Sequence, residues 1–280
     1  KPTLIYKVPF NKEEQMNGNF YEGLAVYQNE HTLKYGYINK QGDTIIPAKY
    51  ITAAPFSDSL GLVSIENEKH AKKFGYINHD GEFVIEAKFD NAYDFSDGLA
   101  VGRYFWADTN GTRIETIIIN KKGNMIGRPL GMTRLSSFNE GYCIEYNMLF
   151  DAVKFIGKNG EYATDFLENA GGFSEGLSPI KIKGKWGYCD TTFKLIIPAI
   201  YNDVGYFSKG IAPVKKGATW GYINKTGETV IPFKYDSCTS FDNLLAKFYF
   251  SQSGYKVNGF INKKGEIVWQ KENFKDKKVE

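Results

Sequence analysis

The segment from Phe207 to Tyr235 decides how this chain folds. It reads Phe207-Ser-Lys-Gly-Ile-Ala-Pro-Val214, then Thr219-Trp-Gly-Tyr-Ile-Asn224, then Val230-Ile-Pro232 and Tyr235. Short runs of β-branched and aromatic residues alternate here with Gly, Pro and Asn, which is typical of short strands joined by tight turns. Nearly the same order begins at Phe173. The segment is therefore one copy of an internal repeat.

Seven copies of this frame fill the chain, and their starts lie 34 to 43 residues apart. They begin near Phe20, Phe56, Phe95, Phe138, Phe173, Phe207 and Phe241. The distance from the Trp-Gly-Tyr position to the next Phe is nearly constant, at 19 to 21 residues. The length variation lies between the first strand of each copy and its Trp-Gly-Tyr position. Because all variable loops leave the same point of the repeat, we expect them on one face.

One repeat is predicted to be an antiparallel meander of three or four strands. In the first copy Leu24-Ala-Val26, Gly36-Tyr-Ile-Asn39 and Thr44-Ile-Ile46 read as strands. The sequence Asn39-Lys-Gln-Gly42 predicts a type I turn, since its Gly is free to take positive φ. Proline cannot donate to a strand ladder, so Pro47, Pro198 and Pro232 are expected to end the third strand.

Such a unit cannot bury its own apolar face and must stack on its neighbours. We expect the columns of aromatic residues, among them Trp186, Trp220, Tyr35 and Phe74, to form that continuous core. Glycine follows in the next column, where a bare backbone lets a neighbouring strand or ring approach closely. This column contains Gly36, Gly75, Gly187, Gly221 and Gly259.

These residues resemble the bacterial WG repeat, also called the KWG repeat. The resemblance rests on Lys185-Trp-Gly-Tyr188, on Thr219–Asn224 and on the recurring Phe-x-x-Gly-Leu-Ala and Val-Ile-Pro patterns, and it covers about residues 20 to 270. Repeats 3 and 4 lack the Trp-Gly pair, and repeat 5 has Phe193 at the turn glycine. The resemblance implies an all-β repeat domain with no common enzymatic activity, and it carries over no catalytic residue.

Two architectures fit seven such units. One is a seven-bladed β-propeller-like ring, and the other is an open β-solenoid of stacked hairpins. Seven copies with little flanking sequence favour the ring, as a single repeat domain over residues 1–280. The segment Thr3-Leu-Ile-Tyr-Lys-Val8 is expected to add a strand to the last repeat and close it.

Composition sets further limits on function. The chain has 280 residues, 16% of them aromatic, with 29 Gly, and most of these residues belong to the repeat columns. With 35 basic and 32 acidic residues, nothing calls for a nucleic-acid partner, and no apolar run is long enough to span a membrane.

Cys143, Cys189 and Cys238 are too widely spaced for a metal pair and read as buried residues. Because the chain begins with Lys1, a removed signal peptide is compatible with it, and we lean toward a secreted or cell-envelope protein.

The sequence offers no chemistry-bearing motif. Its three histidines, His31, His70 and His79, have no metal-ligand spacing, and no phosphate-binding loop or nucleophile elbow occurs. The acids of Asp94-Phe-Ser-Asp-Gly98 read as turn residues. We therefore predict no catalytic residue, no metal, no cofactor and no enzymatic activity. A carbohydrate-active hydrolase with carboxylates in a central pocket and a structural cell-envelope protein remain as alternatives.

The variable loops are the candidate binding elements. The longest runs from Gly102 to Arg113, and its Tyr104, Phe105 and Trp106 lie outside the repeat columns. Other variable loops contain His31, His70 and Tyr255. Exposed aromatic residues are frequent anchors at interfaces. We predict a monomeric binding or scaffold module that presents these residues to a protein or glycan partner.

Overall fold

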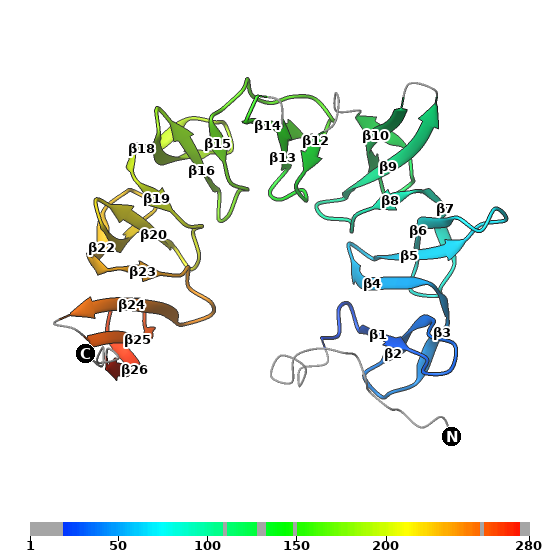
Figure 1. Cartoon of the computed structure of the whole chain (residues 1–280), viewed down its shortest axis with the longest axis horizontal. Coiled ribbons are helices and arrows are strands. Elements are labelled where there is room, and N and C mark those ends of the chain that lie inside the picture. The colour runs from blue at the N-terminus through cyan, green and yellow to red at the C-terminus, as the bar shows by residue number, and fades with distance from the viewer. Residues whose placement is uncertain (1–18, 109–110, 128–132, 148–149, 253–254, 275–280) are drawn as a thin grey trace, which may run out of the picture. The chain divides into compact units, whose positions relative to one another are not determined.

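The computed structural model describes residues 19–108, 111–127, 133–147, 150–252 and 255–274. These residues form 26 β-strands in seven small antiparallel sheets, and no helix occurs among them (Figure 1). The predicted all-β class is confirmed, with one sheet for each of the seven repeats. The segment 3–8, expected to add a closing strand, lies outside the described residues. The choice between a ring and an open solenoid stays a prediction.

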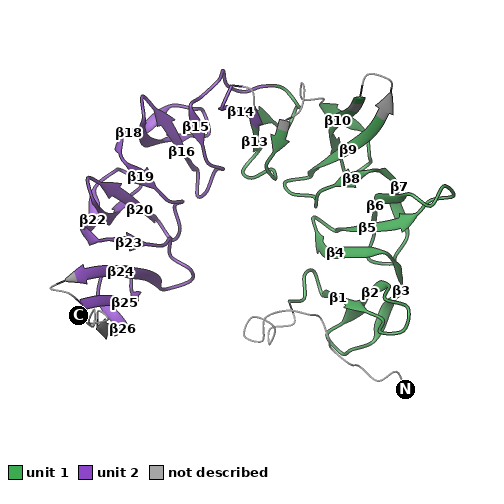
Figure 2. Ribbon diagram, viewed as in Figure 1, with its two compact units in different colours: residues 1–145, 156–161 green, residues 146–155, 162–280 purple. Residues whose placement is uncertain are grey.

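The chain divides into two compact units (Figure 2): unit 1 comprises residues 1–145 and 156–161, and unit 2 comprises residues 146–155 and 162–280. Repeats 1 to 3 form the sheets β1 (Leu24–Gln28), β2 (Tyr35–Asn39), β3 (Thr44–Tyr50); β4 (Thr52–Ser57), β5 (Leu60–Glu66), β6 (Lys72–Ile77), β7 (Phe83–Phe89); and β8 (Asn91–Ala92), β9 (Leu99–Asp108), β10 (Gly111–Asn120), β11 (Met125–Gly127).

Repeats 5 to 7 follow the same order, with a short inner strand before the Phe and the outer strand at the opposite edge, whereas repeat 4 has three strands and no outer one among its described residues. Repeats 4 and 5 form β12 (Thr133–Leu135), β13 (Tyr142–Asn147), β14 (Ala152–Gly157); and β15 (Asn169–Ala170), β16 (Leu177–Ile182), β17 (Lys185–Asp190), β18 (Leu195–Tyr201). Repeats 6 and 7 form β19 (Asp203–Val204), β20 (Ile211–Lys216), β21 (Thr219–Asn224), β22 (Thr229–Tyr235); and β23 (Ser237–Cys238), β24 (Ala246–Gln252), β25 (Tyr255–Ile261), β26 (Ile267–Phe274).

Each repeat turns tightly just after its Phe. In repeat 6 the Ser208 N–H donates to Ile211 O at 2.9 Å and the Ile211 N–H donates to Ser208 O at 3.3 Å, which closes a two-residue loop. Both loop residues have positive φ, 56° at Lys209 and 86° at Gly210, as in the type I′ turn that matches strand twist. The residue two after the Phe has positive φ in every repeat: Glu22, Asp58, Asp97, Glu140, Glu175, Lys209 and Asn243. The interpretation of Asp97-Gly98 as a turn is confirmed.

These turns also fasten neighbouring repeats together. Ser208 Oγ donates to Phe241 O of the next repeat at 2.6 Å, and Ser57, Ser96 and Ser174 do the same in theirs. The acid after the serine accepts N–H groups from the next turn. The Glu175 carboxylate accepts from Lys209 N at 2.5 Å and Gly210 N at 2.9 Å. The residues that define the repeat frame therefore form hydrogen bonds between consecutive repeats, as in other stacked arrays.

The glycine of the Trp-Gly-Tyr position is required by the outer strand. A Cβ added at Gly221 would lie 2.7 Å from Ile231 O, and one added at Gly187 would lie 2.4 Å from Ile197 O. The predicted close approach is confirmed. In the two repeats that lack this glycine, the described residues form a short outer strand or none. In repeat 3, β11 ends opposite Ile118, one residue before Ile117, and repeat 4, with Lys154, has no outer strand among its described residues.

The prediction that proline ends the third strand is wrong. The outer strands β3, β18 and β22 continue past Pro47, Pro198 and Pro232 and end three residues later at tyrosine. In each case the pairing register shifts around the proline. An edge strand that bulges at this point does not need the missing N–H for its ladder, so proline is tolerated.

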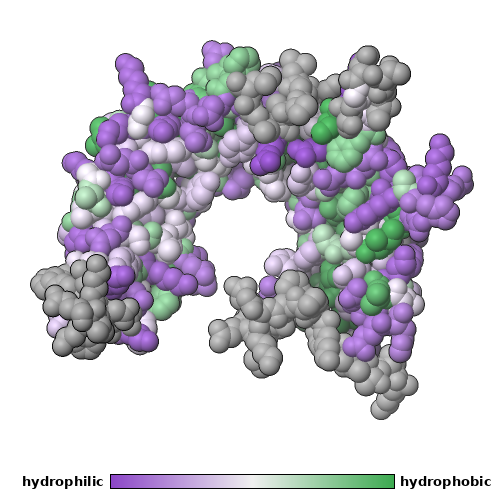
Figure 3. All heavy atoms as spheres, viewed as in Figure 1, coloured by the Kyte–Doolittle hydropathy of each residue, from purple (hydrophilic) through white to green (hydrophobic). Residues whose placement is uncertain are grey.

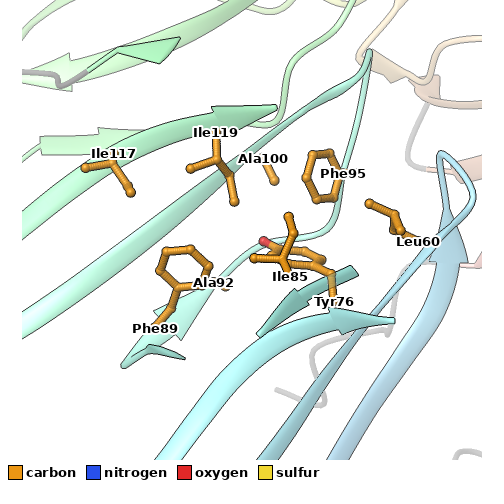
Figure 4. Close-up of a cluster of buried hydrophobic side chains, with 9 residues drawn as sticks. All are labelled: Leu60, Tyr76, Ile85, Phe89, Ala92, Phe95, Ala100, Ile117 and Ile119. Carbon is orange, nitrogen blue, oxygen red and sulfur yellow. The ribbon is translucent and has the colours of Figure 1, made fainter. Parts of the chain in front are cut away.

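In repeats 1, 2, 5 and 6 the tyrosine after this glycine builds the core between repeats. Tyr76 is fully buried, packs edge-on against Phe95 of the next repeat at 4.7 Å between ring centroids, and donates its hydroxyl to Tyr93 O at 2.7 Å. Figure 4 shows Tyr76 among the buried side chains contributed by repeats 2 and 3. The predicted tryptophan column needs correction, because Trp186 and Trp220 are half-buried at the rim of their clusters. They precede the tyrosine by two residues and so lie nearer the end of the sheet.

Repeats 4 and 5 depart from the frame in ways that fit each other. In the regular repeats, the glycine of the Asn-to-Gly turn lies against an isoleucine of the preceding repeat's outer strand. A Cβ added at Gly265, for example, would lie 3.0 Å from Ile231 Cγ2. Repeat 4 has no isoleucine at this place: Ala163 N donates to Phe155 O at 2.8 Å, and only Leu167 forms a bridge, with Val153. Phe193 occupies the turn-glycine position with φ of 63°, and its ring packs 5.1 Å from Phe155 and 5.9 Å from Phe173. The Phe193 ring thus occupies the space that the outer-strand isoleucine fills in the regular repeats.

Candidate functional site

The longest variable loop is a two-stranded ribbon. β9 and β10 each contain ten residues, whereas the corresponding β16 and β17 of repeat 5 contain six. Four extra residues per strand, at about 3.3 Å each, extend the ribbon by about 13 Å. It leaves the sheet at the end opposite to the turn that follows Phe95 (Figure 1). Cross-strand pairing places Phe105 opposite Ile114 and Trp106 opposite Arg113.

The base of the ribbon is held by a carboxylate. Asp90 Oδ2 accepts the Phe105 N–H at 2.8 Å, and Asp90 Oδ1 lies 2.5 Å from Lys73 Nζ. The same position caps the corresponding hairpin in other repeats, where Asp236 accepts the Ser251 N–H at 2.7 Å. Asp90 therefore holds the β9–β10 ribbon at the position where Asp236 holds the β24–β25 hairpin.

The aromatic residues of the ribbon divide into an anchor and an exposed group. Tyr104 is half-buried, with its ring 5.3 Å from Phe89 and 5.9 Å from Trp106. Desolvation raises its pKa, with a further contribution from the negative charges of Glu115 and Asp90. Trp106, Phe105 and Ile114 are 46%, 44% and 39% exposed. Because residues alternate between faces, Trp106 lies on one face of the ribbon and the Phe105–Ile114 pair on the other.

Exposed apolar residues occur elsewhere in unit 1 as well, where green spheres interrupt the purple surface of Figure 3. Ile45 of β3 and Val84 of β7, for example, are exposed on outer strands. Isolated exposure of this kind is normal for soluble proteins. The ribbon differs because two aromatic residues and an isoleucine are exposed on one short projecting element.

The remaining predicted binding residues lie on separate hairpins. His31 is exposed in the β1–β2 loop. His70 is exposed in the β5–β6 loop, with φ of 58° and Nδ1 2.5 Å from Glu66 Oε1. Tyr255 begins β25 in unit 2 and is also exposed. The structure joins Tyr104 and Trp106 by ring contact and places His31, His70 and Tyr255 one to a repeat.

A second exposed aromatic group was missed from the sequence. It consists of Phe150, Tyr162 and Phe166 in repeat 4, where the Lys154 Nζ lies 4.6 Å from the Tyr162 ring centroid and 4.1 Å from that of Phe166. Phe150 and Phe166 are 5.6 Å apart. The available signal was Lys154 itself, since a lysine at the glycine position excludes a regular outer strand and leaves the following aromatic residues outside the frame.

The described residues were searched for a metal site and for a cavity that contains carboxylates. They contain no group of three or more His, Cys, Asp or Glu side chains able to hold a metal ion. A cavity of about 10 Å³, room for one water, lies between repeats 3 and 4 and is lined by one carboxylate, Asp94. Desolvation raises the pKa of that carboxyl. Within the described part no helix is long and apolar enough to cross a membrane. The absence of enzymatic activity stays a prediction.

Comparison with known proteins identifies the repeat. The family model described as WG containing repeat matches residues 35–69, 74–101, 155–186, 186–219 and 220–246. A comparison with curated proteins found no match. Among solved structures, Kluyveromyces lactis Hsv2 is 12% identical with a TM-score of 0.41, over 73% of this chain and 71% of that one. Pyrococcus horikoshii acylaminoacyl peptidase is 13% identical with a TM-score of 0.38, over 81% of this chain and 46% of that one.

Proposed function

The chain belongs to the WG repeat family, and from that premise we propose that it is a non-catalytic binding module whose β9–β10 ribbon docks on a protein partner. The stacked repeats supply a rigid base, and binding elements are most effective when a rigid scaffold positions them. The Asp90 cap and the packing of Tyr104 on Phe89 extend that base into the ribbon.

The observation that carries the proposal is the exposure of Trp106, Phe105 and Ile114 on one projecting ribbon. Large side chains of this kind provide most of the binding energy at protein interfaces when a partner buries them. Both faces of the ribbon carry apolar residues, so a partner that encloses it buries more surface than one that contacts a single ring. A protein cleft meets this requirement better than a glycan that stacks on one aromatic face.

The experiment compares variants in capture and cross-linking. A photo-crosslinking residue placed at position 106 identifies the contacting molecule. Binding of that molecule is then measured for Trp106→Ala and Phe105→Ala, with Phe150→Ala as the matched control in an exposed aromatic group of repeat 4. We expect both ribbon variants to lose at least tenfold in affinity and the control to bind as the wild type does, all three keeping the far-UV circular dichroism spectrum.

Two outcomes would contradict the proposal. Unchanged binding by Trp106→Ala and Phe105→Ala would remove the ribbon from the contact. Binding to an immobilised glycan that is lost in Trp106→Ala would replace the protein partner with the glycan alternative.

A further inference from the structure

In repeat 4 the ammonium group of Lys154 lies between two aromatic rings. Its Nζ is 4.6 Å from the ring centroid of Tyr162 and 4.1 Å from that of Phe166. Both distances are within the range of about 6 Å over which a cation is attracted to a ring face. Among the described residues, no ion pair or hydrogen bond joins the Lys154 side chain to another group. The two ring faces are therefore what holds this positive charge.

The rings around Lys154 are open to solvent. Phe150, Phe166 and Tyr162 are 68%, 48% and 39% exposed. Phe150 adds a third ring, whose centroid lies 5.6 Å from that of Phe166. All four residues belong to unit 2, and we call them the Lys154 site. A group in solution can therefore reach these rings and compete with the ammonium group for their faces.

The charge around the Lys154 site favours a cation. In residues 150–155 and 162–168 of unit 2, Lys154 is the single basic residue, and three residues are acidic: Asp151, Asp165 and Glu168. All three acids are exposed. Aromatic ring faces carry the negative part of the ring quadrupole. The rings and the carboxylates thus select a ligand of the same sign, a positive one.

The chemistry of Lys154 makes it a replaceable occupant. A primary ammonium group has three N–H donors and is strongly hydrated, and ring faces do not satisfy those donors as water does. A quaternary ammonium group has no N–H to satisfy, and aromatic cages bind such groups. Lys154 also stands at the position that is glycine in the regular repeats, for example Gly187 and Gly221, so the sheet does not need a side chain there.

We propose that the Lys154 site binds the quaternary ammonium group of a small molecule. The bound group takes the place of the Lys154 ammonium between Tyr162 and Phe166, with Phe150 beside it. Lys154 acts as an internal competitor, which lowers the affinity according to the fraction of time that its ammonium occupies the rings. The site and the β9–β10 ribbon lie in different repeats, so neither proposal depends on the other.

The test is a titration with choline chloride at constant ionic strength, followed by saturation-transfer NMR of the ligand protons. Ethanolamine, which has the same alcohol and a primary ammonium group, is the matched compound and should bind at least about threefold more weakly. Lys154→Gln removes the competitor and should bind choline about two- to fivefold more tightly, whereas Phe166→Leu removes one ring and should bind it more weakly by a similar factor.

Two variants serve as controls. Lys158→Gln removes a positive charge of the same repeat, one that lies 3.7 Å from Asp97, without emptying the space between the rings. Trp106→Ala removes an exposed ring from the ribbon. Both should bind choline as the wild type does, and circular dichroism establishes that every variant is folded.

Four results would overturn the proposal. The first is no saturable choline binding by either the wild type or Lys154→Gln. The second is ethanolamine binding as tight as choline binding, which would indicate attraction of any cation. The third is Lys154→Gln binding no more tightly than Lys158→Gln. The fourth is Phe166→Leu binding choline as the wild type does, or Trp106→Ala losing this binding.

Discussion

Gly221→Ala tests the physical reason for the Trp-Gly-Tyr frame. The added Cβ would lie 2.7 Å from Ile231 O, whereas ordinary contact begins at 3.4 Å, so β21 and β22 must separate locally by about 0.7 Å, the difference of the two. Overpacking of this kind costs about 1–3 kcal/mol. The reduced entropy of the unfolded chain returns about 0.4–1 kcal/mol. We expect a net loss of about 1–2 kcal/mol in the free energy of unfolding.

The assay is urea unfolding followed by far-UV circular dichroism. Gly172→Ala is the matched control, because a Cβ there meets nothing within 4 Å and the backbone is not in the positive-φ region. That variant should be neutral or slightly stabilised. Gly187→Ala should lose more than Gly221→Ala, since its nearest contact, Ile197 O, is at 2.4 Å. Equal midpoints for Gly221→Ala and Gly172→Ala would refute the close-approach explanation.

Two further predictions concern other parts of the frame. Phe193→Gly should lower the urea midpoint, because the loss of ring packing on Phe155 and Phe173 outweighs the relief of positive φ; a higher midpoint would show that the ring does not fill a needed space. Desolvation raises the pKa of Glu175, but the hydrogen bonds from the N–H groups of Gly210 and Lys209 and the charge of Lys225 outweigh it, so this pKa lies below the usual 4.5. The ionised carboxylate therefore stabilises the fold above pH 4.5, and this contribution is lost as the pH falls through the lowered pKa. Glu175→Gln should therefore reduce stability at pH 7 and progressively less below pH 4.5, and a pH-independent difference would contradict this assignment.

Much of the fold was predictable because the repeat supplies its own alignment. Comparison of the copies gave the strands, the Asn-to-Gly turns and the glycine column without any structural knowledge. The turn at Asn39 forms as expected, with the Gly42 N–H donating to Asn39 O at 3.0 Å and φ of 85° at Gly42. Local turn chemistry and strand patterning act over a few residues, so the sequence reveals them directly.

Features that depend on neighbouring repeats were not predictable in the same way. The hydroxyl of Tyr222 bonds to Thr239 O, and the Glu175 carboxylate bonds to the next turn, but neither acceptor nor donor is encoded by residue type, since both partners are backbone groups. The strand continuing beyond Pro232 was missed because a proline rule for central strands does not apply at an edge.

The candidate site was predictable in part. Loop length and composition pointed to Phe105 and Trp106, and both are exposed. The packing role of Tyr104 depends on Phe89, which belongs to another strand and could not be inferred from the loop alone. The aromatic group around Lys154 occurs in a repeat that lacks the Trp-Gly pair. Alignment with the other repeats could not predict how the residues after Lys154 fold.

The fit between repeat 4 and Phe193 has a consequence for how this array can change over generations. Regular repeats can be duplicated, deleted or exchanged, because each offers the same surfaces to its neighbours. Repeat 4 lacks the outer-strand isoleucine, and the Phe193 ring of repeat 5 packs 5.1 Å from Phe155 in its place, whereas after a regular repeat the same ring would meet an isoleucine. We therefore expect that any rearrangement separating repeat 4 from repeat 5 places the Phe193 ring against an outer-strand isoleucine.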